Sequence, residues 1–219
     1  AAENASHGKD NGALVQNVVK VYWDDHRVQG AECDRGLKIN PVVCANALFP
    51  ILWELRARAR DPQQTIALLE YAEGDPEARA AVASVAEIVR ANLDYLERFL
   101  TSGEWRSGCR YYPSPDAFLS AYSESVFEFP ELFSATTVRA LQQAIVERRG
   151  APTDDPGTDA RTSLNTALRA IAAANVGVDP GPDQEALVAL QSASGAFEDP
   201  GWLYAFGRAS SVKLQRLRQ

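Results

Sequence analysis

The sequence lacks several features that would point to common classes of protein. Its 219 residues include no methionine, two histidines and three cysteines. No apolar run approaches the roughly 20 residues of a transmembrane helix, and residues 1–11 lack the apolar stretch of a secretory signal peptide. Two histidines are too few for a histidine-rich metal centre, and a net charge of −7 argues against general nucleic-acid binding. We therefore expect a cytoplasmic protein with no membrane span and no nucleic-acid partner.

The three cysteines are Cys33, Cys44 and Cys109, and none belongs to a Cys-X-X-Cys pair. An odd number without metal-type spacing is typical of reduced thiols in a cytosolic protein, with Cys44 buried as a small apolar residue. A disulfide between Cys33 and Cys109 is the alternative, because the spacing of cysteines alone does not decide which of them pair.

Hydrophobic residues make up 46% of the chain and charged residues 23%, which is ordinary for a globular domain. Positive charge collects at the C-terminal end, where Arg208, Lys213, Arg216 and Arg218 occur without an acidic residue. We expect a flexible polar segment over 1–11, a helical domain over 12–207 and a basic segment over 208–219.

Apolar residues recur every three or four positions, which indicates helices. The clearest helix begins at Asp75-Pro76 and carries one apolar stripe: Val82, Val85, Val89, Leu93, Leu96 and Leu100. Ser134 predicts the N-cap of a second helix, which should end with Arg148 and Arg149 in its last turn before Gly150. A third helix has Leu164, Leu168 and Ile171 on its apolar face and should end near Gly177.

A fourth helix begins at Asn40-Pro41, and we expect Pro50 to interrupt it before it resumes toward Arg60. Shorter helical segments are expected over 13–23, 62–72, 115–123 and 184–192. Strand-like alternation is absent, so we predict an all-α fold of antiparallel helical hairpins without stable strands. The long loops over 24–40 and 102–113 are the expected locations of functional residues.

Candidate catalytic motifs are few. Asp24-Asp25 could begin an aspartate-rich diphosphate-binding motif, but a DDxxD pattern needs a carboxylate where Val28 stands. Solvated acids at a helix end are the alternative. The sequence contains no pattern typical of histidine-based nucleophilic catalysis, and it contains no glycine-rich phosphate-binding loop.

Aromatic residues crowd two regions: Tyr111, Tyr112, Phe118, Tyr122, Phe127, Phe129 and Phe133, and then Phe197, Trp202, Tyr204 and Phe206. Core packing accounts for most of them. The alternative is a cavity lined by ring faces, each able to stabilise a cation by about 0.5–2 kcal/mol.

Three blocks carry a resemblance to a known family. The first is Val15–His26 leading to the Ile-Asn-Pro-Val-Val-Cys-Ala-Asn run at 39–46, and the second is the Arg-Tyr-Tyr-Pro-Ser-Pro-Asp-Ala-Phe run at 110–118. The third, Leu187–Gly207, contains a QxxxGxW-like repeat with Phe197 in place of tryptophan. In this order they resemble the class II terpene cyclase domain of drimenol-synthase-like proteins, in which a haloacid-dehalogenase-like phosphatase is fused to a cyclase.

The resemblance implies part of an (α/α) toroid and protonation-initiated cyclisation of farnesyl diphosphate to a drimane-type diphosphate, an isomerase- or lyase-type reaction. Mg²⁺ would accompany the substrate diphosphate, and a phosphatase domain would be the partner in the full-length protein. The cavity would be lined by Tyr111, Tyr112, Phe118, Tyr122, Trp202 and Tyr204. Arg110, Arg208 and Lys213 would bind the diphosphate, with Asp24 and Asp25 as Mg²⁺ candidates.

The chain also departs from this family. The family's general acid belongs to a DxDTT or DxDD motif, whereas no Asp-X-Asp triplet occurs here, and the phosphatase motifs are absent. We expect the chain to correspond to the C-terminal part of such a domain. The alternative is a non-catalytic helical binding or scaffold module that kept a toroid-derived fold. A third possibility, a protein-prenyltransferase-like β-subunit, needs zinc ligands, and only His7 and His26 offer imidazoles.

Overall fold

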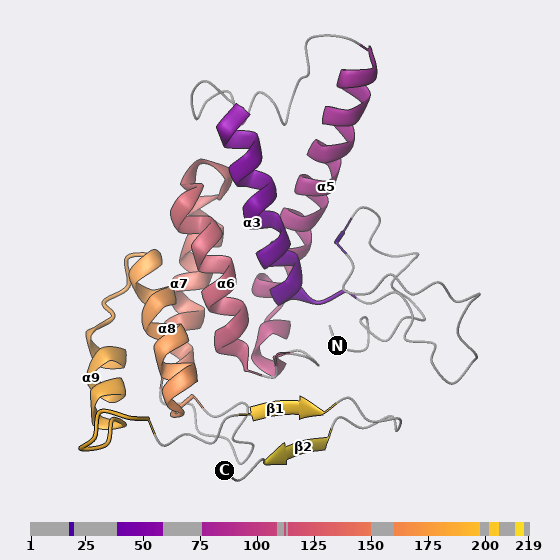
Figure 1. The fold of residues 1–219 in the computed structure, drawn as a ribbon. Helices are drawn as coiled ribbons and strands as arrows, with labels where there is room; N and C mark the ends of the chain where they lie inside the picture. Colours follow the sequence, from indigo (N-terminus) through magenta and orange to yellow (C-terminus); the bar gives the residue numbers. More distant parts are fainter. Residues whose placement is uncertain are drawn as a thin grey trace.

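The fold is built from helices that lie side by side (Figure 1). The computed structural model describes residues 18–19, 39–58, 76–108, 112, 114–149, 160–197, 202–205 and 213–216. Its α-helices are α3 (Pro41–Arg58), α5 (Pro76–Thr101), α6 (Pro115–Glu128), α7 (Ala135–Arg148), α8 (Ser163–Asn175) and α9 (Gly181–Ala189). Two short 3-10 helices, η2 (Glu104–Ser107) and η3 (Pro130–Leu132), flank α6. Most of the described core residues lie on these helices, as predicted from the periodicity.

Local capping chemistry sets where several helices begin. The Ser134 side chain accepts a hydrogen bond from the Thr137 amide at 3.0 Å, which confirms it as the N-cap of α7. Asn40 Oδ1 accepts from the amides of Val42 and Val43 at 3.0 and 3.2 Å and so caps α3. Each contact satisfies a backbone donor that the first helical turn leaves without a partner.

Pro50 does not interrupt α3, so the predicted break was wrong. The helix runs unbroken from Pro41 to Arg58 with Pro50 inside it. Proline removes one amide donor and leaves the carbonyl four residues earlier without its partner. Both Pro50 and Asn46, the residue that carries this carbonyl, lie on the exposed face of α3, where water can replace the missing donor.

Helix α6 is the centre of the packing. It contacts α3 on one side and α8 on another, and α7 also packs against it. Figure 1 shows α3 and α5 running in opposite directions beside each other, as expected for an antiparallel hairpin. Helix α6 buries most of its length, from Pro115 to Val126, because neighbours surround it.

Buried aromatic rings link α5, α6 and the segment after α6. Phe118 meets Phe99 edge to face with 4.8 Å between the ring centroids, and it stacks on Tyr122 at 5.5 Å. Tyr122 in turn meets Phe133 edge to face at 5.6 Å. Offset and edge-to-face arrangements are the favoured geometries for such rings, so this row forms a well-packed part of the core.

The apolar stripe predicted for α8 faces outward, contrary to expectation. Leu164 is 62% exposed and Ile171 48% exposed, whereas Asn165 and Arg169 on the same helix are buried. The helix itself was predicted correctly, but the prediction of which side faces the core was wrong. The reason is the buried polar cluster that Arg169 joins, described below.

A short pair of strands follows the helices, and the prediction of no strand content was wrong here. Strands β1 (Trp202–Ala205) and β2 (Lys213–Arg216) pair antiparallel, with Trp202 opposite Arg216 and Ala205 opposite Lys213. Aromatic residues favour strands, and four residues are too few to show a clear alternation. The helices expected over 13–23 and 62–72 lie outside the described residues.

Cys44 is buried and unoxidised, as predicted, and its thiol donates a hydrogen bond to the Val19 carbonyl at 3.3 Å. Cys33 and Cys109 lie outside the described residues. Within the part of the chain that the structure describes, no helix combines the length and the apolar character needed to cross a bilayer.

Candidate functional site

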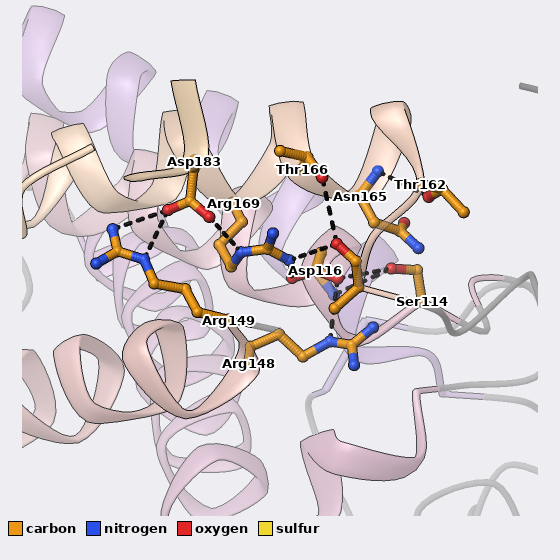
Figure 2. Close-up of polar contacts among 10 residues, drawn as sticks. Ser114, Asp116, Arg148, Arg149, Thr162, Asn165, Thr166, Arg169 and Asp183 are labelled. Atoms are coloured by element: carbon orange, nitrogen blue, oxygen red, sulfur yellow. Dashed lines mark hydrogen bonds and ion pairs between the residues drawn. The ribbon is translucent and has the colours of Figure 1, made fainter. Parts of the chain in front are cut away.

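A buried network of charged residues joins four helices (Figure 2). At its centre is Asp116, in the first turn of α6, whose side chain is inaccessible to solvent. One carboxylate oxygen accepts a hydrogen bond from Arg148 Nε at 3.0 Å, and the other accepts from Arg169 Nη1 at 3.3 Å. Asp116 therefore connects α6 to the end of α7 and to the middle of α8.

Asp183 extends the network to α9. Its Oδ1 accepts from Arg169 Nε at 2.6 Å, and its Oδ2 accepts from Arg149 Nε at 2.8 Å. Arg149 also donates to the backbone carbonyl of Asp179. Arg169 thus lies between two carboxylates, and both oxygens of Asp183 have guanidinium partners.

Two opposing effects act on Asp116. Burial raises the pKa of Asp116 above its ordinary value, because a charge is poorly solvated in the interior. The guanidinium charges of Arg148 and Arg169, and their hydrogen bonds, act in the opposite direction and lower it. The net result is a raised pKa for Asp116, and the two guanidinium groups limit that rise.

A pocket of about 300 Å³ lies next to this network. One part of its wall is polar and comes from Arg149, Arg161, Thr166, Arg169 and Asp183. The other part is apolar and comes from Ala160, Pro182, Ala186, Ala189 and Leu190. The arrangement can hold a molecule that has both a charged and an apolar end.

The aromatic residues predicted to line a cavity are not gathered around this pocket. Phe118 and Tyr122 are each 1% exposed and belong to the ring-packed core. Tyr112 is exposed. None of these three lines the pocket.

The other predicted site residues are placed only in part. Asp24, Asp25, Arg110, Tyr111 and Arg208 lie outside the described residues. Trp202, Tyr204 and Lys213 belong to the paired strands, where the register sets Tyr204 opposite Leu214, the neighbour of Lys213. The backbone therefore brings two predicted aromatic residues and one predicted cation to the same strand pair.

The charged network was not predicted from the sequence. The sequence pattern predicted that Arg148 and Arg149 stabilise the C-terminus of α7 in the usual way, but the structure turns both toward buried carboxylates. An acid in the first turn of a helix, such as Asp116, is common. No sequence signal separates it from a solvated acid.

The loop after α5 contributes to the core. Trp105 in η2 is buried, and the guanidinium of Arg106 lies 4.9 Å from the centre of its ring. Arg106 also pairs with Glu147 of α7. The ion pair between Arg106 and Glu147 thus links η2 to α7.

The QxxxGxW-like repeat forms a compact turn after α9. Gln191 and Phe197 face each other in an antiparallel bridge, and the Gln191 side chain donates to the Gly195 carbonyl at 2.7 Å. Gly195 has φ of +84°, a conformation that favours glycine. The glycine and glutamine of the repeat therefore have identifiable structural roles.

Among the described residues, no group of three or more His, Cys, Asp or Glu side chains is arranged to hold a metal ion. Comparisons of the chain with protein-family models, curated proteins and solved structures find no match. The function is therefore argued from the residues and geometry of the chain itself.

Proposed function

We propose that the chain is the isoprenoid-diphosphate-binding part of a class II terpene cyclase domain, with a fold derived from the (α/α) toroid. The substrate class is farnesyl diphosphate, and the reaction that the domain serves is protonation-initiated closure to a drimane skeleton. The proposal comes from the family resemblance of the three sequence blocks, and the structure adds one supporting observation.

That observation is the placement of the two most specific blocks. Asn40 of the first block caps α3, and Asp116 of the second block begins α6; both side chains are buried. Helices α3 and α6 then pack directly against each other. The blocks therefore form one internal framework, as expected if they were retained together to hold a single site.

The proposal divides the substrate between two sets of residues. The diphosphate is assigned to Arg110, Arg208 and Lys213, and Mg²⁺ would arrive bound to that diphosphate as part of the substrate. The isoprenoid chain is assigned to Tyr111, Tyr112, Trp202 and Tyr204, whose ring faces would stabilise positive charge. Phe118 and Tyr122, which the resemblance also assigns to this lining, are buried in the ring-packed core.

Protonation of the terminal alkene requires a carboxylic acid kept neutral by its surroundings. The chain contains no Asp-X-Asp triplet, so the proposal gives it substrate binding without the acid. Asp116 is not a substitute, because Arg148 and Arg169 surround its carboxylate and it faces the protein interior.

Two measurements test this proposal. Isothermal titration with farnesyl thiodiphosphate, a slowly hydrolysed analogue, should show saturable binding in the presence of Mg²⁺. Incubation with farnesyl diphosphate and Mg²⁺, followed by phosphatase and gas chromatography, should yield farnesol and no drimenol. Arg110→Gln should weaken binding, whereas Arg98→Gln, an exposed change on α5, should not.

The two measurements distinguish the proposed substrate-binding role from a complete cyclase and from a scaffold module. Drimenol made by the chain alone would show that an acid is present after all. Absence of saturable binding would favour the alternative, a non-catalytic helical scaffold module, for which the missing Asp-X-Asp triplet is the specific observation.

A further inference from the structure

We propose that the pocket between α8 and α9 binds an amphiphilic anion, with a phosphate or carboxylate head and a short apolar body. The proposal is independent of farnesyl diphosphate, because the pocket shares no residue with the assigned isoprenoid site. It depends on the free donor atoms, the charge and the wall of the pocket itself.

The first observation is that two guanidinium groups keep unused donors. Arg169 uses Nε for Asp183 and Nη1 for Asp116 and the Ala160 carbonyl. Among the described residues its Nη2 has no hydrogen-bond partner, although the side chain is only 3% exposed. This nitrogen is not sealed from solvent, and Arg169 lines the pocket.

Arg149 offers a second donor. Its Nε and Nη2 bond to Asp183 and to the Asp179 carbonyl, and its Nη1 has no partner within the described part of the chain. Arg149 and Arg169 are held by the same carboxylate, as Figure 2 shows. Their orientation is therefore fixed before a ligand arrives, which lowers the entropy cost of binding.

The second observation is the sign of the charge. Three guanidinium groups, from Arg149, Arg161 and Arg169, line the pocket, whereas Asp183 supplies one carboxylate. Asp116, which is not among the lining residues, also pairs with Arg169. Both oxygens of Asp183 are already occupied by arginine donors. The one carboxylate among these lining residues is therefore already paired with arginines, whereas an anion would find guanidinium donors suited to phosphate or carboxylate.

The third observation is the apolar wall. Pro182, Ala186, Ala189 and Leu190 of the α9 region face the same space as the guanidinium groups. The small alanine side chains leave room for a ligand body. A volume of about 300 Å³ lies at the lower end for ligand pockets, so the apolar body must be short.

The test uses the full chain and four probes: hexyl phosphate, hexanoate, hexanol and inorganic phosphate. Titration calorimetry and NMR chemical-shift mapping should show hexyl phosphate or hexanoate binding at least about tenfold tighter than hexanol and than inorganic phosphate. The two amphiphiles distinguish a phosphate-specific site from a carboxylate site. Equal binding of hexanol and the amphiphiles, or of inorganic phosphate and hexyl phosphate, would overturn the proposal.

Matched variants locate the site. Arg149→Gln should reduce affinity for the amphiphilic anion at least about tenfold. Arg139→Gln, an exposed change on α7, the helix that Arg149 follows, should leave it unchanged. Ala186→Phe should fill the pocket and abolish binding, whereas Val188→Phe, at a 70% exposed position of α9, should not.

Thermal unfolding of each variant checks that the fold is retained. If Arg149→Gln proves too unstable, Ala186→Phe still decides, because it adds volume to the pocket and removes no charged group. Full binding by Ala186→Phe would show that the ligand lies elsewhere. None of these probes is an isoprenoid diphosphate. If none of them binds the pocket, the result with farnesyl thiodiphosphate is unaffected. If farnesyl thiodiphosphate does not bind, the result for the pocket is likewise unaffected.

Discussion

Asp116 and Arg169 lie 53 residues apart in the sequence and form an ion pair in the interior, with 3.3 Å between Oδ1 and Nη1. The pair joins the first turn of α6 to the middle of α8. It also explains why α8 buries its polar side: the guanidinium must face inward to reach the carboxylate. The apolar residues on the opposite side of the helix are then exposed.

Asp116→Asn should strongly destabilise the protein, because it leaves Arg148 and Arg169 buried with one carboxylate fewer. Removing one partner from a buried ion pair costs about 3–5 kcal/mol in the free energy of unfolding. Urea unfolding followed by circular dichroism measures this loss. Asp94→Asn, at an exposed position of α5, is the control and should change stability by less than about 0.5 kcal/mol. A near-neutral Asp116→Asn would mean that the native carboxyl is uncharged.

Phe118→Ala should lower the free energy of unfolding by about 3–5 kcal/mol, since it opens a cavity in the ring-packed core. Phe127→Ala, on the same helix but 63% exposed, should cost far less. Chemical unfolding compares the two variants. If Phe118→Ala kept full stability but weakened binding of farnesyl thiodiphosphate, the ring would line a substrate cavity instead of the core.

Asn40→Ala should cost about 0.5–2 kcal/mol of stability, because the amides of Val42 and Val43 lose their side-chain acceptor. Asn40→Asp should recover most of this loss, since aspartate is an equally good N-cap residue. Asn46→Ala, at an exposed position inside α3, controls for the change in side-chain size. Thermal denaturation measured by circular dichroism separates the three variants. Equal stability of Asn40→Ala and the unaltered chain would show that the cap contributes nothing.

Stability should fall at alkaline pH through Tyr122. Burial raises the pKa of Tyr122, and the charge of Glu97 raises it further, whereas an unfolded tyrosine ionises near 10. The unfolded state therefore loses this proton first, and the folded state loses stability as the pH rises above about 10.

The comparison for this prediction is Tyr122→Phe, which cannot ionise. Unfolding free energies measured by urea at several pH values should be parallel for the two proteins between about pH 7 and 9. Above about pH 10, the protein with Tyr122 should lose stability more steeply than the variant. Parallel curves throughout would contradict a raised pKa for Tyr122.

Capping and periodicity predicted α5, α7 and the beginning of α3, because those features depend on residues a few positions apart. Ser134, for example, bonds an amide three residues later. Pro50 shows the limit of such reasoning. Its effect on α3 depends on whether the released carbonyl of Asn46 faces water, and only the packed structure decides that.

The sequence by itself determined the helical class and several helix beginnings, since these follow from local hydrogen bonds and from spacing along one helix. The tertiary structure decided which side of α8 faces inward, that Phe118 and Tyr122 belong to the core, and that Arg149, Arg169 and Asp183 meet beside a pocket. The physical reason is distance along the chain. A buried charge is stable only beside a partner, and Arg169 finds its partners 14 and 53 residues away.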